Sequence, residues 1–134
     1  MSESTLTHRP AAEIGASPGP ADYFTGIVHL EALAASGVAA DVRRVSFTPG
    51  ARTAWHTHPA GQVLVITSGR GFVATREWSR PIASGDVVEI PAGVEHWHGA
   101  GPDTPMQHLA IQQDPATDWR DQVSDADYEA VHGA

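Results

Sequence analysis

The stretch that decides the fold is GARTAWHTHPAGQVLVITSG, residues 50–69. A turn at residues 59–61 separates two short runs of β-branched and aromatic residues, which predicts two strands joined by a turn. His56 and His58 are two positions apart, so on a strand both imidazoles lie on one face and can share one metal ion. The turn places Gln62 at the start of the returning strand, where its amide oxygen can be a third ligand.

A later stretch, GDVVEIPAGVEHWHGA at residues 85–100, again combines a turn with a histidine pair. After the turn at residues 91–93, His96 and His98 lie on one face of a strand. Three imidazole nitrogens and one amide oxygen suit a divalent ion of manganese, iron, nickel or zinc and leave coordination positions for a small-molecule substrate. The predicted ligands are His56, His58, Gln62 and His96. The histidines without spaced partners are expected to be structural or surface residues: His8, His29 and His132.

Short runs of strand-forming residues, each closed by Gly or Pro, fill the middle of the chain without a helical stretch. They predict an all-β fold, an antiparallel sandwich or barrel. The runs are TGIVHL, VRRVSF, TAWHTH, QVLVIT, GFVATREW, DVVEIP, VEHWHG and MQHLAIQQ. The side chains expected on the inner wall are Val45, Phe47, Leu64, Ile66 and Phe72. Trp55 and Trp97 alternate with the predicted ligands and are expected to face away from the metal.

The two ends of the chain differ from this pattern. Residues 1–20 are rich in Ser, Ala, Pro and Gly, which predicts an N-terminal arm, and residues 21–134 form one domain. Near the C-terminus, WRDQVSDADYEAV at residues 119–131 is typical of a short helix, with Ser124 and Asp127 at capping-box spacing. The side chains expected to be partly buried there are Trp119, Val123, Tyr128 and Val131.

The composition excludes several classes of protein. The chain has no Cys, which excludes disulfide scaffolds, thiolate metal sites and cysteine nucleophiles and is compatible with a reducing cytosol. Its 8 Lys and Arg against 16 Asp and Glu give a net charge of -8, which argues against a nucleic-acid partner. No segment approaches the length of apolar residues that a membrane span or signal peptide requires. We therefore expect a soluble, cytoplasmic protein.

The spacing of these residues resembles the two sequence motifs of the cupin superfamily. Gly50, His56, His58, Gln62 and Gly69 stand at the spacing of the first motif. The second motif is matched by Gly85, residues 91–93 and His96. The resemblance implies a double-stranded β-helix, that is, a jelly-roll barrel with the metal inside. Two positions depart from the family pattern, because Gln62 replaces the usual glutamate ligand and Ala100 replaces a frequent asparagine.

A closer resemblance covers most of the chain and concerns the small bacterial manganese cupins with (R)-selective hydroxynitrile lyase activity. It is carried by GPADYFTG at residues 19–26, GARTAWHTHP at 50–59, HWHGA at 96–100 and HLAIQ at 108–112. The resemblance implies a manganese ion on His56, His58, Gln62 and His96. It also implies that His108 acts as general base. The oligomer implied is a homodimer or homotetramer, which would also cover open sheet edges.

The ligand set has a chemical consequence. Three neutral imidazoles and a neutral amide leave the full charge on the ion, whereas a carboxylate would help to stabilise a higher oxidation state. The presence of Gln62 therefore favours Lewis-acid chemistry over redox cycling. We expect a metal-dependent lyase that cleaves a cyanohydrin reversibly into an aldehyde and cyanide. The alternatives are a cupin dioxygenase or isomerase that acts on a small carbonyl or carboxylate compound, and a small-molecule-binding cupin without activity.

Further residues are candidates for the pocket. His108 and Gln112 share one face of the last strand; His108 is either the base or a polar core residue, and His98 is either a second acid or base or an anchor. The predicted substrate-binding residues are Arg43, Val45, Phe47 and Gln112. An inward Arg43 would favour a carboxylate-bearing substrate. Because Arg44 takes the opposite face, only one of the two can point inward, and Arg43 can alternatively point outward or pair with an Asp at the rim.

Overall fold

The structure of the protein is a computed structural model that describes residues 6–34 and 37–132. A short 3-10 helix at Ala11–Glu13 comes first, and the chain then forms strands up to a single described C-terminal helix, α1 (Asp125–His132). The strands are β1 (Ser17–Pro18), β2 (Phe24–Thr25), β3 (Val28–Ala34), β4 (Asp41–Phe47), β5 (Arg52–Thr53), β6 (His56–Thr57), β7 (Gln62–Ala74), β8 (Ser79–Ala83), β9 (Val87–Ile90), β10 (Trp97–Ala100), β11 (Met106–Gln112) and β12 (Asp118–Trp119).

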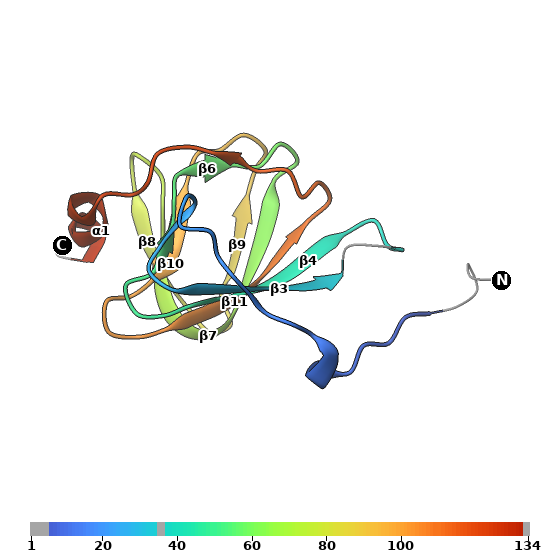
Figure 1. The fold of residues 1–134 in the computed structure, drawn as a ribbon. Coiled ribbons are helices and arrows are strands. Elements are labelled where there is room, and N and C mark those ends of the chain that lie inside the picture. The colour runs from blue at the N-terminus through green and yellow to red at the C-terminus, as the bar shows by residue number, and fades with distance from the viewer. Residues whose placement is uncertain (1–5, 35–36, 133–134) are drawn as a thin grey trace.

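All described strand pairs are antiparallel, and the main sheet runs in the order β1-β3-β4-β11-β7-β10-β5-β2. Strand β7 connects its two halves, since its first part pairs with β11 and β9 and its second part with β10 and β8. The sheet curls around one interior, with the small β6–β12 pair across its upper side and α1 at one end (Figure 1). This architecture confirms the predicted all-β barrel with a short C-terminal helix.

A bulge in β7 changes which side chains face the interior. His108 of β11 pairs with Ile66 and Gln107 pairs with Ser68, so Thr67 is an extra residue in β7. After one extra residue, the side chains of the strand that would have pointed inward point outward, and the reverse. Leu64 and Ile66 therefore point into the barrel as predicted, but Phe72 does not, because it packs against a cluster on the other side of the sheet. The expectation that Phe72 forms part of the inner wall is wrong.

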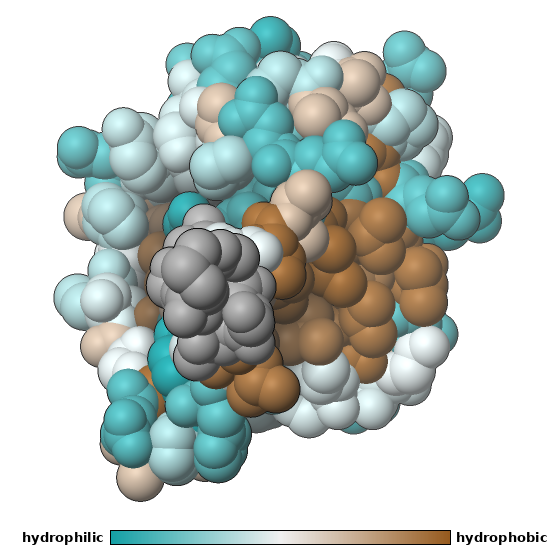
Figure 2. Space-filling view, turned by 90° about the vertical axis from the view of Figure 1, so that its right-hand side faces the viewer, coloured by the Kyte–Doolittle hydropathy of each residue, from teal (hydrophilic) through white to brown (hydrophobic). Residues whose placement is uncertain are grey.

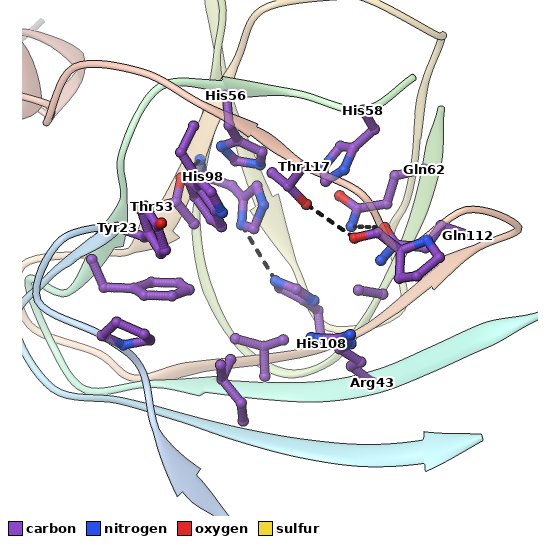
Figure 3. Close-up of a pocket in the computed structure, with 17 residues that line it drawn as sticks. Tyr23, Arg43, Thr53, His56, His58, Gln62, His98, His108, Gln112 and Thr117 are labelled. Atoms are coloured by element: carbon purple, nitrogen blue, oxygen red, sulfur yellow. Dashed lines mark hydrogen bonds between the residues drawn. The ribbon is translucent and has the colours of Figure 1, made fainter. Parts of the chain in front are cut away.

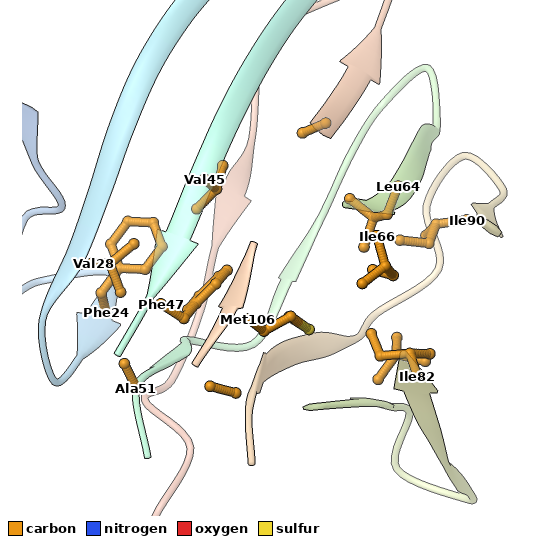
Figure 4. Close-up of a cluster of buried hydrophobic side chains, with 13 residues drawn as sticks. Phe24, Val28, Val45, Phe47, Ala51, Leu64, Ile66, Ile82, Ile90 and Met106 are labelled. Atoms are coloured by element: carbon orange, nitrogen blue, oxygen red, sulfur yellow. The ribbon is translucent and has the colours of Figure 1, made fainter. Parts of the chain in front are cut away.

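The main hydrophobic core gathers side chains from strands on several sides of the barrel (Figure 4). Phe47 and Leu64 are 2% and 0% exposed, and both come from strands whose alternate residues point inward. The other large core side chains are Phe24, Val28, Val45, Ile66, Val73, Ile82, Ile90 and Met106. Burial of these apolar groups stabilises the barrel and fixes the positions of the strands that carry the polar residues.

A second apolar cluster lies under the C-terminal helix. Trp55 and Trp97 pack there with Val123 and Tyr128, on the side of the sheet away from the predicted ligands. The hydroxyl of Tyr128 donates to the carbonyl oxygen of Ala100 over 2.7 Å, which satisfies its polar atom. The two tryptophans are thus structural residues, as their alternation with the histidines predicts.

The helix is shorter than the sequence suggests. The hydroxyl of Ser124 accepts a hydrogen bond from the backbone N–H of Asp127 over 3.1 Å, so the predicted cap is formed. Trp119, however, lies in β12 opposite His56, and the expectation that it begins the helix is wrong. The reason is that backbone bonds from Arg120 to Trp55 and from Trp55 to Asp121 hold this segment extended.

The N-terminal segment runs along the edge of the sheet. Residues 6–16 are mostly exposed, and β1 then pairs with β3 through Ser17 and Pro18. The guanidinium of Arg9 donates to the backbone carbonyls of Ala32 and Leu33. The division into an arm and one domain stays a prediction. Within the described residues, no helix has the length and hydropathy that a membrane crossing requires.

Candidate metal centre

Three histidines converge near the wall of the barrel. His56 and His96 lie opposite each other as an antiparallel bridge, with backbone N–H···O distances of 3.0 and 3.1 Å in the two directions. His58 follows two residues after His56 and joins them, so that one ring nitrogen of each histidine lies within 4.8 Å of the others. The geometry thus brings together the three histidines that the sequence predicts as ligands.

Hydrogen bonds fix how two of these rings present their nitrogens. Nδ1 of His56 lies 2.8 Å from the carbonyl oxygen of Ala54, and Nδ1 of His96 lies 3.0 Å from that of Val94. Because a carbonyl oxygen only accepts, each Nδ1 carries the hydrogen and each Nε2 keeps its lone pair. Nε2 of His96 is buried without a hydrogen-bond partner, and so are both ring nitrogens of His58. Such unpaired lone pairs are what a metal ion takes.

A chain of side-chain hydrogen bonds orients the amide of Gln62. Its nitrogen donates to the side-chain oxygen of Gln112 over 2.7 Å, and the Gln112 nitrogen donates to Oδ2 of Asp41 over 2.9 Å. The carboxylate only accepts, so it fixes both amides in one orientation. Oε1 of Gln62 is consequently buried without a partner, and Figure 3 shows His58 and Gln62 side by side at the same part of the pocket.

The donor set fits a divalent transition metal. Imidazole nitrogens and an amide oxygen are ordinary ligands for such ions, and second partners on the ring N–H groups are typical of metal-binding histidines. A buried polar atom without a partner costs about 1–3 kcal/mol, so the unpaired atoms of His58, Gln62 and His96 favour a bound ion. The three-histidine cluster is therefore a candidate metal centre, with Gln62 beside it.

The surroundings keep these imidazoles neutral, which metal binding requires. Burial, followed by repulsion from His96, lowers the pKa of His56 well below its ordinary value. Burial also lowers the pKa of His58, and it lowers that of His96 to about 4. At neutral pH all three rings are therefore unprotonated, and their lone pairs are available.

A second pair of histidines lies next to the cluster. His98 of β10 and His108 of β11 approach with Nδ1 of the former 3.3 Å from Nε2 of the latter (Figure 3). Burial lowers the pKa of His108 to about 4 and that of His98 well below its ordinary value. The ring of Phe47 packs against both, with centroid distances of 5.8 Å to His98 and 5.5 Å to His108. Both histidines are thus rigidly held, neutral and able to exchange one proton.

These groups open into a cavity of about 310 Å³. Arg43, Val45 and Gln112, three of the predicted substrate-binding residues, line it, whereas Phe47 lies beneath the His98–His108 pair instead. His98 and His108 line the cavity together with His56, His58 and Gln62. Sequence reasoning missed the lining residues that come from loops and short strands, which are Pro20, Tyr23, Phe24, Thr53, Pro115, Thr117 and Trp119.

Two of the missed residues form one wall of the cavity. The rings of Tyr23 and Trp119 stack with centroids 4.7 Å apart, and the Trp119 ring lies 4.7 Å from that of His56. The signal for Tyr23 was present in the sequence, because it falls within the segment at residues 19–26 that carries the closer resemblance. Trp119 lacked a usable signal, since its position depends on the pairing of β12 with β6.

The structure also separates the two neighbouring arginines of β4. Arg43 lines the cavity, and its Nε donates to Oδ2 of Asp41 over 3.0 Å. Arg44 lies on the other face, where Nε and Nη2 donate to the two oxygens of Glu31 over 2.8 and 3.0 Å. The inward arginine is thus Arg43, and it pairs with an aspartate of its own strand.

The remaining histidines lie away from this site. His29 is an exposed residue of β3, and His8 is exposed in the N-terminal segment. The side chain of His132 falls outside the described residues.

Comparison with known proteins gives a consistent result. The family model for the cupin domain matches residues 43–112. An (R)-mandelonitrile lyase from Granulicella tundricola is 50% identical over an alignment 117 residues long, which covers 82% of this chain and 88% of the lyase. The crystal structure of a cupin-like protein from Thermotoga maritima superposes with a TM-score of 0.81 at 42% identity, over 86% of this chain and 92% of that one. An acireductone dioxygenase from Gluconobacter oxydans is 32% identical over 68 residues, 48% of this chain and 36% of the dioxygenase.

Proposed function

Because the chain belongs to the cupin family, we propose that it is a manganese-dependent lyase that cleaves a cyanohydrin reversibly into an aldehyde and hydrogen cyanide, with (R) selectivity. The observation that carries the proposal is the 50% identity to an (R)-mandelonitrile lyase over 82% of the chain. A fold alone would not support it, because this scaffold hosts many chemistries. The histidine-rich pocket supplies the chemical support.

The proposed metal ligands are His56, His58, His96 and Gln62. Since all four are neutral, a bound divalent ion would keep its full charge and act as a Lewis acid that stabilises negative charge on the reacting substrate. Manganese is the proposed ion, with iron, nickel and zinc as the alternatives that the same ligands accept. The absence of a carboxylate from the set is the reason to prefer this chemistry over dioxygen activation.

His108 is the proposed base. It takes up the hydroxyl proton of the cyanohydrin at a ring nitrogen, and the electrons of the O–H bond form the carbonyl double bond. The carbon–carbon bond to cyanide breaks, its electron pair leaves with cyanide, and His108 returns the proton to give hydrogen cyanide. The low pKa of about 4 keeps His108 unprotonated before the reaction at neutral pH. The 3.3 Å contact between its Nε2 and Nδ1 of His98 makes His98 the proposed second carrier of that proton.

The experiment is to load the purified protein with Mn²⁺ and incubate it anaerobically with mandelonitrile. We expect benzaldehyde and cyanide to form without oxygen. A protein that consumes oxygen with a catechol, diketone or enol and leaves mandelonitrile intact would instead be a dioxygenase, the candidate that the partial match to acireductone dioxygenase favours. Isomerisation of a small carbonyl or carboxylate compound without cyanide release would indicate the isomerase. A protein that binds its ligand without turnover would be a binding module.

We further infer that the enzyme works in the cytoplasm as a homodimer or homotetramer. The lack of Cys suits a reducing compartment. Figure 2 shows apolar residues gathered on the face that lies at the right-hand side of Figure 1, and a broad apolar surface of this kind suits contact with a second copy of the chain. Light scattering coupled to size-exclusion chromatography tests the assembly, and a monomeric mass would contradict it.

A further inference from the structure

One charged side chain, that of Arg43, lines the described part of the pocket of this acidic protein. The chain carries 16 Asp and Glu against 8 Lys and Arg. Yet the cavity wall, as far as the described residues form it, contains Arg43 and neither Asp nor Glu. The predicted ligands are neutral, so a bound divalent ion would add positive charge to the same space. The neighbouring Asp41 carboxylate offsets part of the Arg43 charge, so the preference of the pocket for an anion depends on which Arg43 nitrogens stay unpaired.

The strand register places Arg43 near the proposed base His108. In the sheet it is paired with Ala110, and the next inward pair along the same two strands is Val45 with His108. Two residues along a strand span about 7 Å. Ala110, the strand partner of Arg43, carries only a methyl group, and Arg43, Ala110 and His108 line the same cavity. A ligand that reaches from His108 to Arg43 therefore needs about the length of one substituted aromatic ring.

The guanidinium of Arg43 is held at one edge only. Within the described residues, its one ion pair runs from Nε to Oδ2 of Asp41; the side chain of Arg43 is 42% exposed at the cavity, whereas that of Asp41 is 6% exposed. Asp41 also accepts from Gln112 and is thereby fixed. Among the described residues, Nη1 and Nη2 of Arg43 have no hydrogen-bond partner, whereas Arg44 on the outer face uses two nitrogens on Glu31. The end of the Arg43 guanidinium is thus free to bind a carboxylate.

We propose that the substrate of this pocket carries a carboxylate at the end remote from its reacting carbon, and that the two terminal nitrogens of Arg43 bind it. This inference rests on the proposed function for the reacting end, where His108 meets the hydroxyl. The substrate class is then the cyanohydrin of an aldehyde acid, such as an aromatic ring with the carboxylate opposite the reacting carbon. A neutral cyanohydrin such as mandelonitrile leaves the two terminal nitrogens of Arg43 without a substrate carboxylate to bind.

The first test compares two substrates in the manganese-loaded enzyme: mandelonitrile and the same compound with a carboxylate para to the cyanohydrin carbon. We expect kcat/KM to favour the carboxylate by about 10- to 100-fold, the range of a charge-assisted hydrogen-bonded pair. In Arg43→Gln this ratio of kcat/KM values falls at least about tenfold. Arg43→Lys keeps the positive charge but loses the paired N–H donors of the guanidinium, so it gives an intermediate ratio. The matched control is Arg44→Gln, whose side chain lies outside the pocket and which keeps the wild-type ratio.

The second test is independent of turnover. Calorimetric titration of the manganese-loaded protein compares 4-(hydroxymethyl)benzoate with its neutral isostere 4-(hydroxymethyl)benzamide. A preference for the benzoate that Arg43→Gln and Arg43→Lys reduce, in variants whose circular dichroism matches the wild type, supports the carboxylate site even if no cyanohydrin is cleaved. Equal binding of the two probes, or a preference that survives in both Arg43 variants, overturns it, and the lyase proposal would still stand if mandelonitrile is cleaved.

Discussion

The side-chain nitrogen of Gln62 donates to the side-chain oxygen of Gln112 over 2.7 Å, and this bond decides which end of the Gln62 amide is left for a ligand role. Without it the amide could rotate and present its N–H₂ group, which cannot bind a cation. Asp41 fixes the donor-to-acceptor direction of these hydrogen bonds, since its carboxylate accepts from the side-chain nitrogen of Gln112 over 2.9 Å. The amide oxygen is thus presented by residues that have no ligand role themselves.

Replacement of Gln112 by Leu should weaken metal binding. The change removes the acceptor that orients Gln62, and loss of such an outer partner typically costs about 10- to 100-fold in metal affinity. Free Mn²⁺ measured by electron paramagnetic resonance during a titration gives the affinity directly. The control is Gln107→Leu on the same strand, because Gln107 bonds to Ser46 and Thr67 and does not line the pocket. Equal Mn²⁺ affinities for the two variants would show that the hydrogen bonds from Gln62 through Gln112 to Asp41 do not position Gln62 as a metal ligand.

The metal-free protein should lose stability as the pH falls below the ordinary pKa of histidine. Burial holds the pKa values of His96 and His108 at about 4 when folded, whereas in the unfolded chain they return to the ordinary 6.5. Between these values the unfolded chain binds protons that the folded chain excludes. Each histidine therefore lowers the free energy of unfolding by about 1.4 kcal/mol for each unit by which the pH falls within this interval.

Urea unfolding of the metal-free protein at pH 7, 6 and 5 measures this effect. The decrease should become smaller in His108→Gln, because one protonation step is removed. A free energy of unfolding that stays constant over this range would mean that folding does not lower the pKa values of the buried histidines.

The close approach of β7 and β10 predicts a strong effect of a single methyl group. A Cβ on Gly71 would lie 1.9 Å from the carbonyl oxygen of Gly99, so the backbone itself would have to move. Gly71→Ala should reduce stability by about 2–3 kcal/mol and the Tm by about 6–12 °C. Gly15→Ala is the control, since nothing lies within 4 Å of a Cβ there. Thermal unfolding followed by circular dichroism compares them, and equal Tm values would refute the close approach.

Much of the barrel follows from local pattern. The alternation in VRRVSF and MQHLAIQQ predicts β4 and β11 and the faces of Arg43 and His108, because the side-chain period of a strand is two wherever no bulge intervenes. The histidine spacing likewise predicts the three-histidine cluster, since each pair is local and the turns bring the strands together. These features depend on residues that are near neighbours in the chain or on one regular strand.

What could not be predicted depends on register or on contacts between distant segments. The bulge at Thr67, which turns Phe72 outward, is visible only in the pairing of β7 with β11. The relay from Asp41 through Gln112 to Gln62 needs the registers of β4, β11 and β7 at once. The sequence places Asp41 on the same inward face of β4 as Arg43, because the two residues are two positions apart. This alternation does not identify a hydrogen-bond partner on another strand.

The proposed lyase chemistry requires one pocket to combine a metal held by histidines with His108 as the base. The most direct measurement is the rate of cyanide release from (R)-mandelonitrile by wild type and by His108→Ala, each assayed with its manganese content determined in the same sample. We expect that His108→Ala keeps its manganese and loses activity by about 10²- to 10⁴-fold, while His56→Ala loses the metal. Wild-type rates in manganese-loaded His108→Ala would contradict it.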